Sequence, residues 1–162
     1  MNTGNSSYPI QEYIDRVEEG MRANTDVHQA EINAAKEHLL AAGGKRIRPA
    51  STLLTGKMLG GSIDKLIILS AAIELLHTAT LVHDDIIDDS VQRRGQLTTQ
   101  QKYGKDYAVY TGDYIFTKCF EILAEHYELH HMQELSKTVS RVCMGEIDQF
   151  DGRFKSHTSV KK

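Results

Sequence analysis

Four carboxylates stand together in the segment 83–89, His-Asp-Asp-Ile-Ile-Asp-Asp, directly after a long apolar stretch. Asp84 and Asp88 are four residues apart, so on a helix they project from one face with their Cβ atoms ~5–6 Å apart. Acids at the C-terminal end of a helix oppose the helix dipole at a cost of roughly 0.3–1 kcal/mol each, which a cation relieves. Mg2+ keeps several waters and takes other ligands from substrate phosphate. We therefore predict that Asp84 and Asp88 hold Mg2+.

A second interpretation of these acids is a solvated helix end capped by Asp85 or Asp89, because a short DDxxD pattern alone is not specific. Arg93 and Arg94 follow within one short turn, and two guanidiniums can bind phosphate oxygens in bidentate fashion. Simple neutralisation of the aspartates would explain this pair equally well. Acids and arginines together favour a metal and diphosphate site.

A further basic cluster lies at 43–49, Gly-Gly-Lys-Arg-Ile-Arg-Pro. The glycine pair allows a sharp turn, after which Lys45 and Arg48 can converge near the N-terminus of a helix beginning at Pro49, a favourable place for an anion. The segment lacks the glycine spacing of a P-loop. His77 lies seven residues before Asp84 and thus on the same helix face, although a lone histidine there is more often a core residue.

The elements that must position these residues are helical, since only two prolines occur and no alternating strand pattern is evident. The segment from Asp64 to about Asp88 is apolar nearly all round, as expected of a central helix. The sequence therefore predicts an all-α fold. The other expected helices begin at Ile10, run from Asp26 to Leu40, from Pro49 to Gly60, from Asp106 to His126, and from Gln133 to Phe150 after a break at His130-His131.

Composition narrows the class of protein. The chain has 162 residues, 40% of them hydrophobic and 25% charged, with a formal net charge of -3, which gives no attraction to nucleic acid. The most apolar run, Leu66 to Ile73, is too short to span a membrane, and the N-terminus does not resemble a signal peptide. Cys119 and Cys143 stand in apolar helical surroundings without CxxC spacing, so we expect buried, reduced thiols and a cytoplasmic location.

The motifs resemble those of the trans-isoprenyl diphosphate synthases, the polyprenyl synthetase family. The matching segments are 43–49, His-Thr-Ala-Thr-Leu-Val-His-Asp-Asp-Ile-Ile-Asp-Asp at 77–89, Arg-Arg-Gly at 93–95, Gly112-Asp113, and Gly-Glu-Ile at 145–147 with Gln149. Within this family, the sequence is most similar to the heptaprenyl and octaprenyl types of synthase, which make medium or long products. The resemblance implies an isoprenoid synthase-type helical bundle, of which residues 1–162 form the N-terminal helices in a single, incomplete domain.

The resemblance also implies a Mg2+-dependent transferase that condenses isopentenyl diphosphate with an allylic prenyl diphosphate to give a longer trans-polyprenyl diphosphate. By this resemblance the catalytic residues are Asp84, Asp85, Asp88 and Arg93, with Arg93 at the allylic diphosphate. The isopentenyl diphosphate pocket is implied at Lys45, Arg48, His77 and Arg94.

Ala79 and Thr80, about one turn before the aspartates, bear on product length. Short-product members of the family often carry a bulky aromatic residue here, so two small residues indicate an open tunnel and a longer product. Close packing of helices would equally require small side chains.

The family's second aspartate-rich motif has no counterpart in these residues, so we expect the chain by itself to be inactive. A homodimer or a heteromer with a partner subunit is expected, because an incomplete bundle exposes apolar surface. A non-catalytic, partner-dependent subunit is the main alternative function. A terpene cyclase is a weaker one, since it does not need the basic pocket of isopentenyl diphosphate.

Overall fold

A computed structural model of the chain describes residues 10–152. The described part divides into two compact units, one ending at His126 and one beginning at Tyr127. The all-α prediction is confirmed; the prediction of a single domain stays a prediction. The helices are α1 (Ile10–Ala23), α2 (Ala30–Ala41), α3 (Ile47–Met58), α4 (Ile63–Ile87), α5 (Thr99–Tyr103), α6 (Lys105–His126) and α7 (Leu129–Gly152), and the strands are β1 (Gln92–Arg93) and β2 (Gln96–Leu97).

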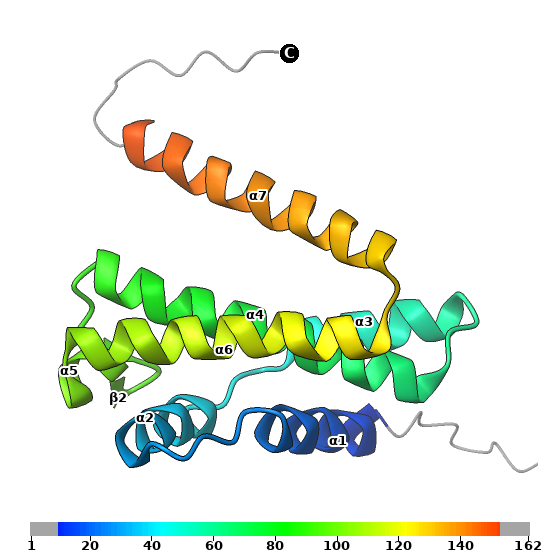
Figure 1. Ribbon diagram of the computed structural model, residues 1–162, viewed down its shortest axis with the longest axis horizontal. Helices are drawn as coiled ribbons and strands as arrows, with labels where there is room; N and C mark the ends of the chain where they lie inside the picture. Colours follow the sequence, from blue (N-terminus) through cyan, green and yellow to red (C-terminus); the bar gives the residue numbers. More distant parts are fainter. Residues whose placement is uncertain (1–9, 153–162) are drawn as a thin grey trace, which may run out of the picture. The chain divides into compact units, whose positions relative to one another are not determined.

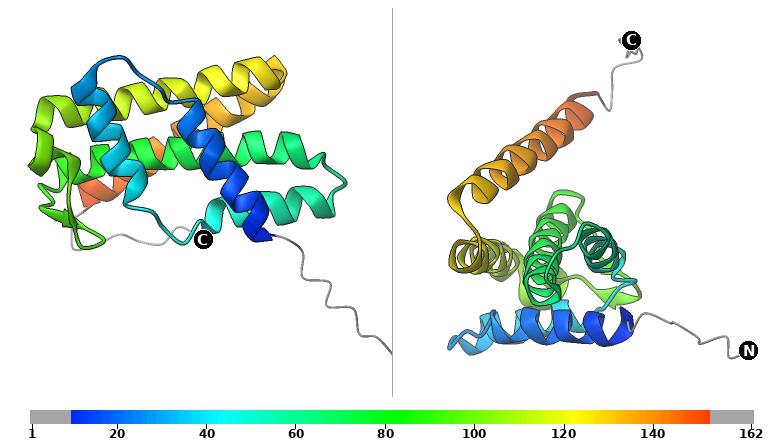
Figure 2. Two further views of the ribbon diagram at one scale, coloured as in Figure 1. Left: turned by 90° about the horizontal axis from the view of Figure 1, so that it is seen from below. Right: turned by 90° about the vertical axis from the view of Figure 1, so that its right-hand side faces the viewer.

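Helix α4 is the spine of the first unit, as its pattern predicted. It runs side by side with α6 and also packs against α3 and α1 (Figures 1 and 2). Helices α1 and α2 form a layer on one side of the α4 and α6 pair. Because neighbours lie around α4, apolar residues are needed on most of its circumference. Its buried apolar residues are Leu66, Ile67, Ala71, Ala72, Leu75, Ala79 and Val82.

Among the described residues, α4 is the one helix long and apolar enough to cross a membrane by length and composition. More than half of its most apolar stretch, 56%, is buried by the rest of the protein. The core helix of a soluble protein meets the same criterion, so the composition of α4 is explained by its central place in the bundle.

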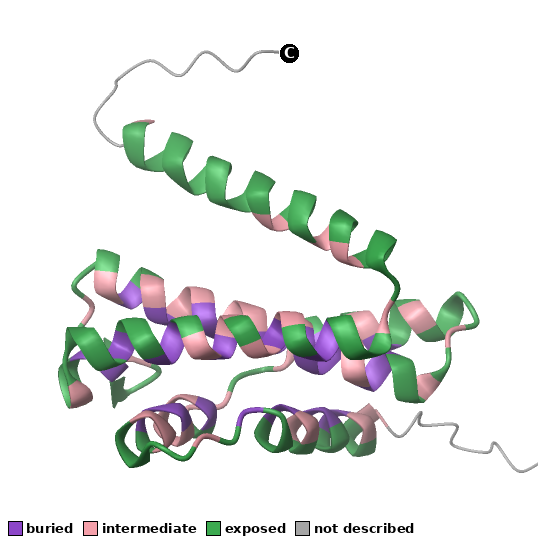
Figure 3. Ribbon diagram, viewed as in Figure 1, coloured by how far each residue is buried: buried purple, intermediate pink, exposed green. Residues whose placement is uncertain are grey.

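Helix α1 has the amphipathic pattern that predicted it. Ile14, Val17 and Met21 are buried and recur at helical spacing, whereas the opposite face of the helix is exposed (Figure 3). The face toward α4 is therefore set by these three residues.

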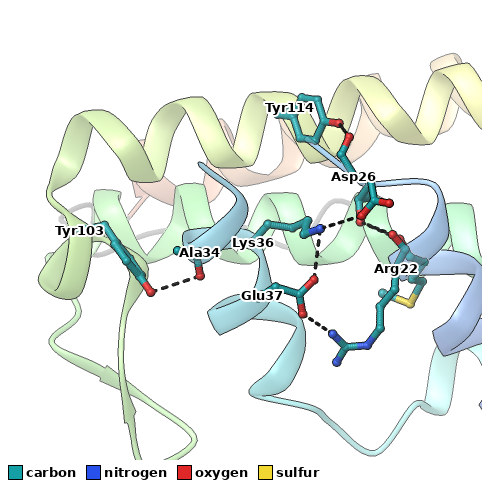
Figure 4. A network of polar contacts seen from close by, with 9 residues as sticks. Arg22, Asp26, Ala34, Lys36, Glu37, Tyr103 and Tyr114 are labelled. Atoms are coloured by element: carbon teal, nitrogen blue, oxygen red, sulfur yellow. Dashed lines mark hydrogen bonds and ion pairs between the residues drawn. The ribbon is translucent and has the colours of Figure 1, made fainter. Parts of the chain in front are cut away.

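The expected start of the second helix at Asp26 is wrong, because Asp26 makes tertiary contacts instead of capping α2. Its backbone carbonyl accepts a hydrogen bond of 2.6 Å from the Tyr114 hydroxyl on α6 (Figure 4). Its carboxylate lies 3.6 Å from Nζ of Lys36. The Lys36 side chain is only 1% exposed, and its Nζ also lies 3.1 Å from Oε1 of Glu37. A buried ammonium needs such partners, so the loop before α2 is fixed by pairing and the helix begins four residues later.

Two helix starts also differ from the predictions, and two short elements, the hairpin and helix α5, were not predicted. Helix α3 begins at Ile47, not at Pro49, because Arg46 already supplies the N-terminal cap position. The short β1 and β2 hairpin was not expected at all. Helix α7 begins at Leu129, so His130 and His131 lie inside it and do not break it.

The two cysteines have different environments. Cys119 is fully buried on α6, and burial raises the pKa of its thiol to about 12, which keeps it protonated. Cys143 on α7 is exposed, so the prediction of a second buried thiol is wrong. None of the described residues of α7 is buried, which removes the expected apolar surroundings.

Candidate functional site

The aspartate motif ends α4 with two carboxylates on one exposed face. Asp84 and Asp88 are both exposed, and Asp88 is the C-cap residue, its backbone N–H donating to the Asp84 carbonyl at 2.9 Å. The cap is thus neither Asp85 nor Asp89. Within residues 10–152 no group of three or more His, Cys, Asp or Glu side chains could hold a metal. Two hard carboxylates still fit Mg2+, which can complete its coordination with water and diphosphate oxygens.

Asp85 lies on a different face of the helix and is only 4% exposed. Its Oδ1 accepts a hydrogen bond of 2.8 Å from Nε of Arg93, so the predicted catalytic pair is joined directly. The amide of Gln100 on α5 donates to the backbone carbonyls of Asp85 at 2.7 Å and Ser90 at 3.1 Å. These contacts fix the turn that follows the aspartates, and they direct Asp85 inward.

The hairpin carries Arg94 to the glycine pair of the basic segment. Arg94 has a left-handed backbone conformation with φ of 54° in the turn between β1 and β2. Its guanidinium lies so close to Gly44 that a Cβ there would be 2.5 Å from Nη1. Lys45 and Arg48, near the start of α3, are exposed. Glycine at 44 therefore leaves room for the Arg94 guanidinium beside a basic segment that is distant in sequence.

A pocket in the first unit gathers four of the predicted residues, His77, Asp85, Arg93 and Arg94. Four others, Lys45, Arg48, Asp84 and Asp88, are not part of its lining. The remaining lining residues are His38, Leu39, Leu40, Ala42, Gly43, Arg46, Glu74, Thr78, Leu81, Gln96, Leu97, Thr98 and Thr99.

The charge around His77 indicates the kind of ligand this pocket suits. Burial lowers the pKa of His77 below its ordinary value, and the positive charges of Arg48, Arg94 and Arg93 lower it further, while Glu74 opposes them. The three arginines thus create a positive potential at the imidazole. Such a field attracts an anion, and a neutral imidazole can still donate one hydrogen bond to it.

Sequence reasoning missed Arg46, Glu74 and Glu18. Arg46 Nε donates to Glu18 Oε1 on α1 at 2.7 Å, and its Nη1 donates to Glu74 Oε1 on α4 at 3.1 Å. One available signal was Glu74 itself, a single acid in the apolar part of α4, since a buried charge requires a partner. The identity of that partner could not be predicted, because it lies 28 residues away in sequence.

The two positions linked to product length have different environments. Ala79 is fully buried in the core of the first unit. Thr80 is half-buried, its hydroxyl donating to the His77 carbonyl at 2.8 Å, and it lies one turn before Asp84 on the same face. Of the two, Thr80 is therefore the one aligned with the aspartate face.

The family model described as polyprenyl synthetase matches residues 29–162. This chain belongs to the polyprenyl synthetase family. The match includes both basic segments, all of α4 and the aspartate motif, so the predicted family is confirmed on the residues that suggested it.

Relatives of this polyprenyl synthetase chain agree in fold and sequence. Heptaprenyl diphosphate synthase component 2 from Geobacillus stearothermophilus is 40% identical over 86% of this chain and 43% of that protein. The solved structure of heptaprenyl diphosphate synthase from Staphylococcus aureus has a TM-score of 0.87 and 33% identity, covering 93% of this chain and 48% of that one. A polyprenyl synthase from Caulobacter crescentus CB15, solved with calcium and isoprenyl diphosphate, has a TM-score of 0.82 and 33% identity, covering 91% and 44%. The chain thus spans about half the length of these relatives.

Proposed function

We propose that this chain forms half of the active site of a prenyltransferase that joins isopentenyl diphosphate to an allylic prenyl diphosphate. The observation that carries the proposal is the convergence of His77, Arg93 and Arg94 in one pocket along α4, the helix whose C-terminal end carries the exposed Asp84 and Asp88. Arginines and two carboxylates on one helix are the charges that a diphosphate with a divalent cation requires.

We propose for each residue the role that the resemblance to the polyprenyl synthetase family implies. Asp84 and Asp88 would hold Mg2+, which when bound supplies Lewis acid stabilisation to the departing diphosphate. Arg93 binds the allylic diphosphate and is oriented by Asp85, whose Oδ1 lies 2.8 Å from Arg93 Nε. Isopentenyl diphosphate is bound by four residues: Lys45, Arg48, His77 and Arg94. The allylic C–O bond breaks with its electron pair leaving on diphosphate, the alkene of isopentenyl diphosphate forms the new C–C bond, and a proton is lost to restore an alkene. The apolar helices exclude water from the allylic cation.

The relatives support this proposal in their names. One of them was solved with calcium and isoprenyl diphosphate, so a divalent cation and an isoprenoid diphosphate occur together in the family. The heptaprenyl names of two others favour a medium or long product, in agreement with the small side chains of Ala79 and Thr80. We also propose a cytoplasmic location. In the described residues only α4 is long and apolar enough to cross a membrane, and 56% of its most apolar stretch is buried within the protein.

A partner-dependent subunit is the second candidate function. The name component 2 on the Geobacillus relative describes one part of a synthase with more than one component. Since the chain spans about half of the relatives' length, we propose that it is inactive by itself and acts as a homodimer or a heteromer with residues supplied from elsewhere. A non-catalytic subunit would retain the fold without needing the metal face.

Calorimetric titration tests the proposed site. We expect isopentenyl diphosphate to bind without metal, and farnesyl diphosphate to bind only with Mg2+. Asp88→Asn should weaken Mg2+-dependent binding of farnesyl diphosphate at least tenfold, whereas Asp89→Asn, which removes the neighbouring charge paired with Lys105, should change it less than twofold. If the chain binds farnesyl diphosphate but does not bind isopentenyl diphosphate, a terpene cyclase is indicated instead. If it binds neither compound, the proposed site is excluded.

A further inference from the structure

Arg46 stands in the basic segment 43–49 but does not share the exposure of its neighbours. Lys45 and Arg48 are exposed, whereas the Arg46 side chain is only 11% exposed and is turned between α1 and α4. Its two ion pairs join three elements, because Glu18 lies on α1, Glu74 on α4 and Arg46 at the N-cap of α3. The guanidinium fork suits two carboxylates at once in a way that an ammonium does not.

The backbone of Arg46 is strained at the position from which its side chain reaches both glutamates. Its φ of 46° and ψ of 36° lie in the left-handed region, which favours glycine and costs an ordinary residue about 1–2 kcal/mol. Such a conformation persists only when the surrounding contacts compensate for it. Burial lowers the pKa of Arg46, but the hydrogen bonds to Glu18 and Glu74 outweigh this and raise it, so the side chain stays charged. The ion pairs are therefore the contacts that hold the turn.

Glu74 gives the arrangement a consequence for anion binding. Its side chain is 7% exposed and lies in the lining of the pocket that also contains His77 and Arg94. Its Oε1 is paired with Arg46, whereas its buried Oε2 has no hydrogen-bond partner within residues 10–152. A buried carboxylate on the wall of an anion site repels the ligand unless a cation offsets its charge.

We propose that Arg46 is a positioning residue that fixes the segment 43–48 against α1 and α4 and neutralises Glu74 in the pocket. This inference rests on the proposed function in naming isopentenyl diphosphate as the anion, but its structural part does not need a ligand. Lys45 and Arg48 then owe their placement to a neighbour whose guanidinium is held by Glu18 and Glu74.

The first test uses the ligand-free chain. In Arg46→Met, hydrogen exchange measured by mass spectrometry should become at least tenfold faster in peptides covering 43–53, where the backbone N–H of Ala50 donates to the Arg46 carbonyl, with no change in α6. Arg16→Met is the matched control, because Arg16 also links α1 to α4 through a 2.7 Å ion pair, with Asp64, but is exposed and does not line the pocket. Unchanged exchange in the segment of a folded Arg46→Met variant would overturn the proposal. Circular dichroism shows whether Arg46→Met is folded. If that variant unfolds, Arg46→Lys, which keeps one ion pair, takes its place, and its hydrogen exchange in the segment should be faster than in the unaltered chain but slower than in an unfolded chain.

The second test separates neutralisation from general loosening. Calorimetric titration with isopentenyl diphosphate should show at least tenfold weaker binding for Arg46→Met. The double variant Arg46→Met/Glu74→Gln removes the uncompensated charge and should bind at least threefold more tightly than Arg46→Met, while the loosened segment 43–48 keeps its binding weaker than that of the Glu74→Gln single variant. No recovery would contradict the neutralising role.

The two tests distinguish this inference from the proposed function. If the unaltered chain fails to bind isopentenyl diphosphate while Arg46→Met still loosens the segment 43–48, the proposed function fails and the positioning role stands. If the unaltered chain binds and Arg46→Met neither loosens the segment nor weakens binding, the proposed function stands and the inference about Arg46 fails.

Discussion

Burial and the positive charges of Arg48, Arg94 and Arg93 lower the pKa of His77, so this histidine stays neutral in the folded chain at pH values where an exposed one takes up a proton. Neutrality matters for the proposed site because the imidazole then contributes a directed hydrogen bond without adding charge. In the proposed site the arginines would supply the attraction for the anion, and His77 would supply its orientation.

The lowered pKa of His77 predicts a dependence of stability on pH. Below the ordinary histidine pKa of about 6.5 the unfolded chain binds more protons than the folded one, so the free energy of unfolding falls as the pH falls. His77→Gln removes this contribution. We expect the free energy of unfolding of the variant, measured with urea at pH 7.5, 6.5 and 5.5, to fall less steeply than that of the unaltered chain. Replacing the exposed His28 by Gln should leave the original slope, and equal slopes for all three proteins would contradict the prediction.

Residue types and spacing predicted which side chains gather in the pocket better than the sequence predicted how those side chains pair. The acids and arginines of 84–94 were identified from spacing alone, and the structure brings Arg93 and Arg94 into one pocket with His77. The inward turn of Asp85 follows from helical geometry, since adjacent residues point about 100° apart, but its partner Arg93 was assigned to substrate. Pairing between elements depends on packing that one sequence does not reveal.

At the scale of elements, long apolar periodicity was a reliable guide and short polar segments were not. The predicted limits of α4, Asp64 to about Asp88, differ by one residue at each end from Ile63–Ile87. The hairpin has two residues in each strand, too few for an alternating pattern. The start of α2 was misplaced because Asp26 has the side chain of a good N-cap but binds Lys36. Tertiary pairing decided these boundaries against local preference.

The contact between α3 and α4 depends on glycine at position 56. A Cβ there would lie 2.9 Å from Leu66 Cδ1 and 3.1 Å from Cγ, so rotation of the leucine methyl groups cannot relieve the overlap. Alanine favours a helix interior by about 1 kcal/mol, but overpacking a core contact costs about 1–3 kcal/mol. Together these effects predict that Gly56→Ala lowers the free energy of unfolding by about 0–2 kcal/mol in urea titrations. Gly145→Ala on α7, where no atom lies within 4 Å of the added Cβ, has only the helix gain and should not lower it; equal changes in the two variants would show that Leu66 moves freely out of the contact.

At the scale of the whole molecule, the chain spans about half the length of its relatives. It also exposes apolar residues on one helix. The solved heptaprenyl diphosphate synthase from Staphylococcus aureus has 48% of its length covered. On α7, the apolar residues Val139, Cys143, Ile147 and Phe150 recur at helical spacing on one face, and the last three are exposed. An apolar face of this kind is typical of an interface with further protein.

This face of α7 predicts self-association of the chain by itself, because two apolar faces gain more by pairing than by contact with water. Sedimentation velocity should show dimers or larger species at micromolar concentration for the unaltered chain. The double variant Ile147→Ser/Phe150→Ser should shift the distribution toward monomer, since it removes two side chains that are 52% and 59% exposed. Gln133→Ser/Lys137→Ser, which changes two exposed polar residues of the same helix, should leave the distribution unchanged. If the apolar double variant sediments like the unaltered chain, association must use another surface, and the exposed residues Leu54 and Met58 of α3 become the next to alter.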